Sequence, residues 1–169
     1  MLALELCDPS VDGDLADPTA AGRWLRTHGL RADLNADGLA DLRTLRDAID
    51  ALLRAAAANT APPSSALDEL NARSAAAAAC LQLNWPAAGV PRMWLSTPGG
   101  PDASVLGAVA RSAIELLSGR DRERLRVCGA HGCERLFLAT SSRQQWCSAA
   151  CGNRVRVARH AARGRTGSD

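Results

Sequence analysis

Four of the six cysteines lie in one short C-terminal segment, and their spacing limits what this part of the chain can fold into. The pattern reads Cys128-x4-Cys133-x13-Cys147-x3-Cys151. Two cysteine pairs, each closed by a short loop, are typical of a tetrahedral Zn²⁺ site with four thiolate ligands. Four thiolates fill the coordination shell of the ion, so the pattern predicts a structural zinc ion and not a catalytic one.

The same residues leave other interpretations of the cysteines open. Two disulfide bonds would need an oxidising compartment, and a thioredoxin-like redox pair would have a two-residue spacer, which this segment lacks. His131 lies inside the first loop and is the alternative to Cys133 as a ligand. Cys7 and Cys80 stand alone in apolar settings, so we expect both to be small buried side chains.

Charge is divided unevenly along the chain. Residues 1–119 carry nine Arg and fourteen Asp or Glu, a net charge of −5, whereas residues 120–169 carry eleven Arg and four acidic residues, a net charge of +7. A cationic module attached to an acidic body suggests an anionic polymer as the partner. We therefore predict two domains, an acidic and mostly helical body of residues 1–119 and a basic zinc finger of residues 120–169.

Hydrophobic periodicity predicts a mainly α-helical body with a small β-hairpin. Asp17 is the expected N-cap of the first helix, with Pro18 at its first position and Gly29 just past its end. Ser64 or Ser65 is the expected cap of a third helix, and Gly119 is the expected stop of the fourth. We expect helices over residues 18–28 and 35–59, a third that begins after this serine cap and continues to about Ala77, and a fourth over residues 103–118, with hairpin strands over residues 80–85 and 92–97.

The residues after Cys147 predict a final helix that carries the last ligand. The stretch "SAACGNRVRVARHAARGR" has no proline, and Ser148 is its expected N-cap. Cys151 then lies in the first turn, where the helix dipole favours the thiolate form. Together with an intervening hairpin, this arrangement is a treble-clef-like zinc finger. Cys151, Val155, Ala158 and Ala162 share the helix face that we expect to pack on the hairpin.

Arginines occupy the other side of this helix, and they suggest contact with nucleic acid. An arginine side chain can neutralise phosphates and can pair bidentately with guanine. In the alternative interpretation, the same arginines only balance the charge of a dianionic zinc–thiolate centre and complement the helix dipole. The expected nucleic-acid contacts are Arg143, Asn153, Arg154, Arg156, Arg159 and Arg163.

The C-terminal stretch "FLATSSRQQWCSAACGNRVRVARHAARGR" resembles the bacterial CGNR zinc-finger family, whose motif is found here as Cys151-Gly152-Asn153-Arg154. The preceding segments "ADPTAAGRWLRTHGL" and "LGAVARSAIELLSGRDRERLRVC" resemble the helical ABATE domain that usually accompanies this finger. The resemblance implies a stress-induced transcription regulator with a ligand-sensing helical domain and a DNA-binding finger. The family often has an Asn-Thr pair where this chain has Asp8-Pro9, so a ligand pocket lined by these positions would be altered here.

These observations predict a bacterial transcription regulator that binds DNA through the finger. An RNA-associated zinc protein and a protein-interaction adaptor with a purely structural zinc site are the alternatives. We expect the acidic body to bind an unidentified small-molecule effector or to form a homodimer.

No enzymatic activity and no membrane association are expected. The histidines His28, His131 and His160 are scattered, and the sequence has neither a nucleophile–base set nor a phosphate-binding loop. No run approaches eighteen apolar residues, and the first residues lack the basic region of a signal peptide. We therefore expect a cytoplasmic location.

Overall fold

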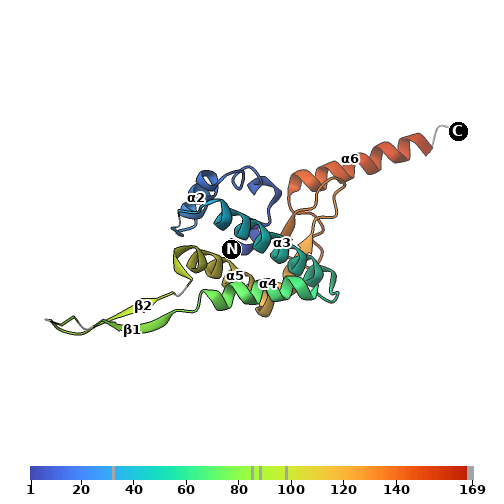
Figure 1. Ribbon diagram of the computed structural model, residues 1–169. Helices are drawn as coiled ribbons and strands as arrows, with labels where there is room; N and C mark the ends of the chain where they lie inside the picture. Colours follow the sequence, from blue (N-terminus) through green and yellow to red (C-terminus); the bar gives the residue numbers. More distant parts are fainter. Residues whose placement is uncertain (32, 85, 88, 98, 167–169) are drawn as a thin grey trace.

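A computed structural model describes residues 1–31, 33–84, 86–87, 89–97 and 99–166. It confirms the predicted fold class, a mainly helical protein with small antiparallel hairpins and a C-terminal cluster of four cysteines (Figure 1). In the described part of the chain, no helix has the length and apolar character needed to cross a membrane. The elements are α1 (Leu2–Leu6), η1 (Pro9–Val11), α2 (Pro18–Thr27), α3 (Ala36–Ala58), α4 (Ser64–Ala76), β1 (Cys80–Asn84), β2 (Arg92–Ser96), α5 (Gly100–Ser118), η2 (Arg120–Arg124), β3 (Leu125–Val127), β4 (Leu136–Leu138) and α6 (Ala149–Thr166).

Side-chain caps fix where two of the helices begin. The Asp17 carboxylate accepts a hydrogen bond from the backbone N–H of Ala20 at 2.9 Å, as the sequence predicts for the start of α2. The Asn35 side chain caps α3 in the same way. The predicted cap of α4 is wrong, because Ser64 is already helical and the N-cap is Pro63, which has no side-chain hydrogen bond to offer.

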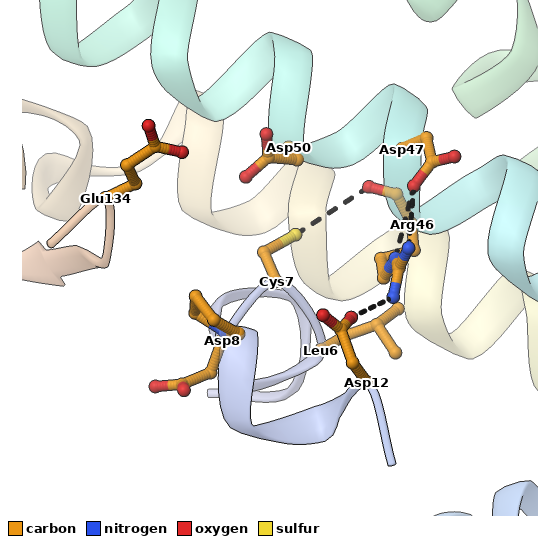
Figure 2. Close-up of a pocket in the computed structure, with 9 residues that line it drawn as sticks. Leu6, Cys7, Asp8, Asp12, Arg46, Asp47, Asp50 and Glu134 are labelled. Carbon is orange, nitrogen blue, oxygen red and sulfur yellow. Dashed lines mark hydrogen bonds and ion pairs between the residues drawn. The ribbon is translucent and has the colours of Figure 1, made fainter. Parts of the chain in front are cut away.

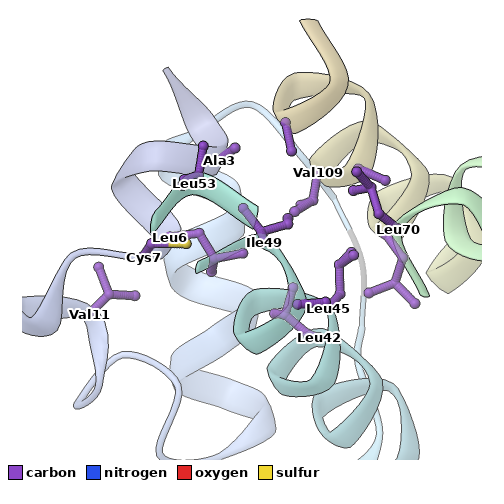
Figure 3. Packing of buried hydrophobic residues seen from close by; sticks show 14 of the residues in the cluster. Ala3, Leu6, Cys7, Val11, Leu42, Leu45, Ile49, Leu53, Leu70 and Val109 are labelled. Carbon is purple, nitrogen blue, oxygen red and sulfur yellow. The ribbon is translucent and has the colours of Figure 1, made fainter. Parts of the chain in front are cut away.

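Helix α3 is the centre of the core, and the other helices of the body pack around it (Figure 3). Its leucine and isoleucine stripe recurs at three- and four-residue steps, so one face can be buried along the whole helix. Leu70 of α4 and Val109 of α5 pack in the same cluster as this face. Ala3 and Leu6 of α1 belong to this cluster as well. The most completely buried members of the stripe are Leu42, Leu45, Ile49 and Leu53.

The contact between α4 and α5 leaves no room for a side chain at Gly107. A Cβ added there would lie 1.9 Å from the Cβ of Ala77. Gly107→Ala gains about 1 kcal/mol of helix propensity, but overpacking of this kind costs about 1–3 kcal/mol. We therefore expect the substitution to lower the free energy of unfolding by up to about 2 kcal/mol, measured by urea denaturation. Gly13→Ala is the matched control, since nothing lies within 4 Å of its added Cβ; equal stability losses in both variants would contradict the packing argument.

The hairpin β3–β4 belongs to two cores at once. It pairs Leu125 with Leu138 and Val127 with Leu136. Leu125 and Leu136 are buried in the main core beside α3, whereas Phe137, from the same strand as Leu136, lies in a second small cluster with the cysteines. The hairpin is therefore the point where the helical body and the cysteine segment are joined.

Polar contacts strengthen this junction. Arg54 of α3 donates a hydrogen bond to the backbone carbonyl of Glu134 at 3.1 Å, and Arg135 forms an ion pair with Asp8 at 3.0 Å. The predicted domain boundary falls after Gly119, which ends α5. It stays a prediction, and the packing of β3–β4 indicates that the finger sits directly against the body.

The hairpin β1–β2 has the predicted antiparallel pairing but extends away from the helices (Figure 1). The expected burial of Cys80 is wrong, because the first strand of this hairpin is exposed along its whole length. Within the described residues, the Cys80 thiol donates to the backbone carbonyl of its cross-strand partner Ser96, at 3.6 Å. Cys7 is buried as expected.

Candidate metal centre

Two turns bring the four cysteines together. Cys128 directly follows β3, and the backbone N–H of Cys133 donates to the carbonyl of Ala130 to close the first turn. Gly132 has a φ of +70°, a conformation that residues with a Cβ rarely adopt, so its place in this turn follows from its lack of a side chain. Gly129 approaches the second half of the finger, where its N–H donates to the carbonyl of Gln145 at 3.0 Å.

The helix start positions the second pair. The backbone N–H of Cys151 donates to the Ser148 hydroxyl at 3.2 Å, which confirms Ser148 as the cap of α6. Cys147 lies just before α6 and Cys151 within its first turn, as the sequence predicts. Both thiols are therefore held by the local backbone of a helix terminus.

The four Sγ atoms have the spacing that a tetrahedral metal ion requires. All of them lie within 4.8 Å of one another. The Cys133–Cys147 distance is 3.8 Å and the Cys147–Cys151 distance is 3.6 Å. Thiolates bound tetrahedrally with metal–sulfur bonds of about 2.3 Å are separated by about 3.8 Å, whereas a disulfide bond measures about 2.05 Å. The cysteines are free thiols, and their arrangement suits a metal ion and not a pair of disulfides.

His131 lies outside this group. Its side chain is exposed, and the residues whose ligand atoms converge in the described part of the chain are the four cysteines. The alternative in which His131 replaces Cys133 therefore finds no support in the geometry.

Hydrogen bonds to sulfur favour the thiolate form at one corner of the cluster. Burial acts to raise the pKa of Cys128, but the backbone N–H groups of Cys147 and Ala130 donate to its sulfur and lower the pKa to about 7. Burial and the neighbouring sulfurs instead raise the pKa of Cys147 to about 12. The guanidinium of Arg154 adds positive charge at the opposite corner, with Nη2 3.5 Å from the Sγ of Cys151.

A small apolar shell and one polar bridge surround the sulfurs. Phe137 and Ala139 are buried against the cluster, and Trp146 is half-buried. Gln144 closes the loop before Cys147, because it accepts from the backbone N–H of Thr140 at 2.8 Å and donates to the carbonyl of Trp146. Sequence reasoning missed Gln144, since a glutamine in an exposed loop carries no distinguishing signal.

Helix α6 leaves the cluster after about two turns and projects from the molecule (Figure 1). Val155 is half-buried against the cysteines, but Ala158 is exposed, so the predicted packing of this face continues only as far as Val155. Residues 156–161 are exposed, so the small cluster around the cysteines covers only the start of the helix. The side chain of Ala162 lies outside the described residues.

The predicted nucleic-acid contacts divide into two sets. Arg154 is exposed but turns toward Cys151, and Arg156 donates a hydrogen bond to the side chain of Asn153. Arg159 and Arg143 are also exposed, the first on α6 and the second in the turn before it. The side chain of Arg163 lies outside the described residues, although its backbone continues α6.

A cavity of about 390 Å³ lies where the body meets the finger (Figure 2). Asp8 and Pro9 line it together with Glu134 from the finger. Arg46 is held by Asp12 at 2.7 Å and by Asp47 at 3.1 Å. Burial raises the pKa of the Cys7 thiol in its wall to about 12, so this thiol stays protonated at neutral pH.

This geometry defines a class of protein in which a helical domain is joined to a compact finger with a four-cysteine metal site. Two family models match the chain. The ABATE model, described as "Putative stress-induced transcription regulator", matches residues 2–120, and the CGNR zinc finger model matches residues 124–164. The chain therefore belongs to the ABATE family and carries a CGNR zinc finger. No curated protein matches the chain.

Proposed function

We propose that this protein is a transcription regulator that binds duplex DNA through α6, with a structural Zn²⁺ ion held by Cys128, Cys133, Cys147 and Cys151. The observation that carries the proposal is a projecting helix with exposed arginines, fixed at its base by a four-sulfur site. The family description agrees with this role. Bacterial DNA lies in the cytoplasm, so we also propose a cytoplasmic location for a regulator that binds it.

Zinc is the ion that this ligand set favours. Thiolate ligands in tetrahedral geometry select zinc or iron–sulfur chemistry over hard cations, which prefer oxygen ligands. Zinc bound here would connect the loop after β3 to the start of α6. Four sulfurs leave no open coordination position, so we propose that the site is structural and that the protein is not an enzyme.

The charge of α6 supports an anionic partner. From Ser148 to Thr166 the sequence contains arginines and no acidic residue. Arg154 is placed to balance the negative charge of the thiolates, as in the charge-balance interpretation. Arg156 and Arg159 face solvent farther along the helix, so the charge of the thiolates does not account for their positions. We infer that these arginines, with Arg143 in the turn, contact phosphates.

Aromatic side chains argue for duplex DNA over single-stranded RNA. Proteins that read single-stranded RNA usually stack its bases on exposed aromatic rings. The finger has Phe137, which is buried, and Trp146, which is half-buried against the cysteines. A projecting helix is instead the element that enters a major groove. Competition of labelled duplex DNA with unlabelled single-stranded RNA separates the two partners, since the RNA should displace it poorly.

Salt dependence tests whether the contact is with phosphates. If α6 and the turn neutralise about five phosphates, the logarithm of the binding constant should fall with the logarithm of salt concentration with a slope of about −4 to −5. Fluorescence anisotropy of labelled duplex DNA between about 50 and 200 mM salt measures this slope. The control is protein treated with a chelator, which should lose binding. An affinity that does not change with salt would rule out the phosphate contacts and favour a protein-interaction adaptor.

A further inference from the structure

The hairpin β1–β2 has one face made of aliphatic side chains alone. Its register pairs Leu81 with Leu95 and Leu83 with Met93, and residues two apart in a strand point to the same side. These four side chains therefore form one continuous patch, which we call the aliphatic face. Each of them is exposed by 65% to 70%. The opposite face carries Cys80, Gln82, Asn84, Arg92 and Ser96 among the residues whose side chains are described.

This chain does not cover its own aliphatic face. The hairpin projects from the end of α4 and the start of α5, away from the helices and from α6 (Figure 1). Within the described residues, no side chain of β1 or β2 belongs to either buried cluster. The main core is completed by the helices and by β3–β4, so burial of the aliphatic face is not needed to close it.

An isolated two-stranded hairpin is marginally stable in water, and alternation of aliphatic and polar residues is the pattern of a strand that packs on one side. A solvent-exposed hairpin with this pattern therefore indicates a packing partner. Patches of a few hundred Å² or more on otherwise folded proteins mark interaction sites.

We propose that the aliphatic face is a homodimer interface, in which the hairpins of two copies pack face to face about a two-fold axis. A face of four aliphatic side chains with no charge is complementary to itself, which is the requirement of an isologous contact. Two hairpins packed in this way form a small four-stranded sandwich whose aliphatic side chains point inward. The polar faces stay in water.

The available area is sufficient for this contact. The four side chains expose on the order of 500 Å² per copy, so a symmetric pair that covers all of this area would bury on the order of 1,000 Å², the lower limit for a specific interface. The bodies carry a net charge of −5 over residues 1–119 and would repel each other in close contact. Projection of the hairpin lets the uncharged faces meet while the acidic bodies stay apart.

Charge around the hairpin disfavours a lipid surface as the partner. Segments that insert into anionic membranes carry flanking basic residues. From Ala77 to Gly99 the sequence contains one charged residue, Arg92. A second copy of the chain is therefore the occupant that the hairpin fits best.

Multi-angle light scattering of the zinc-loaded full chain, separated by gel filtration, tests the proposal. The wild-type chain of 17.7 kDa should elute with twice that mass at micromolar concentration. Leu83→Asp combined with Met93→Asp places two charges on the aliphatic face and should raise the dimer dissociation constant by about 100-fold or more. Circular dichroism and zinc content should be unchanged, because the hairpin lies outside both cores.

Gln82→Asp combined with Asn84→Asp is the matched control, since it adds the same charge to the polar face. This variant should remain dimeric. A wild-type chain that is monomeric up to about 100 µM would overturn the proposal, as would a dimer that survives the Leu83 and Met93 substitutions. Binding of a monomeric wild-type chain to phosphatidylglycerol vesicles that is lost in the Leu83→Asp, Met93→Asp variant would assign the face to lipid instead, because the arginines of α6 are the same in both chains. None of these outcomes depends on DNA binding.

Discussion

Replacing Cys151 with alanine is expected to abolish stable zinc binding and to release α6 from the cysteine cluster. Cys151 supplies one of the four converging sulfurs and belongs to the first turn of α6, so one substitution removes both a ligand and the anchor of the helix. The second core contains few apolar residues, namely Ala130, Phe137 and Ala139 with the half-buried Trp146 and Val155. Without the metal, so small a cluster cannot hold the segment together.

The expected size of this effect is large. Structural zinc supplies about 10–16 kcal/mol of apparent binding free energy, so an equal share for each of four ligands is about 2.5–4 kcal/mol. Loss of one ligand should therefore weaken zinc binding by about 10²–10³-fold. Elemental analysis of the purified chain should give one zinc per wild-type chain and much less in the variant. Limited proteolysis should cut the variant in the loop between β4 and α6.

Cys80→Ala is the matched control, because Cys80 is exposed on the hairpin β1–β2 and lies outside the group of converging sulfurs. This variant should retain its zinc and its resistance to protease. The helical body should survive in both variants, since its core is centred on α3. Full zinc occupancy in Cys151→Ala would show that this sulfur is not a ligand.

Replacing Arg156 and Arg159 together with alanine should remove most DNA affinity while the finger stays folded. Both side chains are exposed on the part of α6 beyond the cysteine cluster, so their loss leaves the four sulfurs undisturbed. Each phosphate contact that is lost should reduce the salt slope by about 1, so the double variant should have a slope lower by about 2. The affinity itself should fall by about 10²-fold, since two such contacts together contribute roughly 2–3 kcal/mol.

Anisotropy titration and zinc analysis of the same samples measure the two properties separately. Arg23→Ala with Arg111→Ala removes equal charge from exposed positions on α2 and α5, and its DNA affinity should stay close to wild type. If both double variants lose affinity equally, binding reflects net charge and not α6. If neither does, the arginines of α6 serve charge balance and solvation.

Much of the fold could be predicted because its signals are local. The capping side chain of Asp17 and the leucine stripe of α3 are contained within single helices, and the structure confirms both. The spacing of the four cysteines also carries its own geometry, because each pair is closed by a short turn. The cap of α4 failed since a serine can occupy the first helical turn as well as the cap.

What could not be predicted depends on the surface that each element meets. The periodicity of α6 identifies the face that carries Val155 and Ala158, but not that the small cluster around the cysteines ends before Ala158. The apolar surroundings of Cys80 suggested burial, although its strand is exposed along its whole length. The three-residue strand β3 is too short to show that Leu125 belongs to the core of the helical body.

Hairpin β3–β4 packs in the main core and in the cysteine cluster, so the orientation of α6 depends on the packing of the helical body. From Arg156 to Thr166 the part of the helix beyond the cysteine cluster is about 15 Å long, so a tilt of about 10° at its base would displace its end by about 3 Å. A hydrogen bond is about as long as that displacement. A small shift of the core around Leu125 would therefore produce a larger displacement at the C-terminal end of α6.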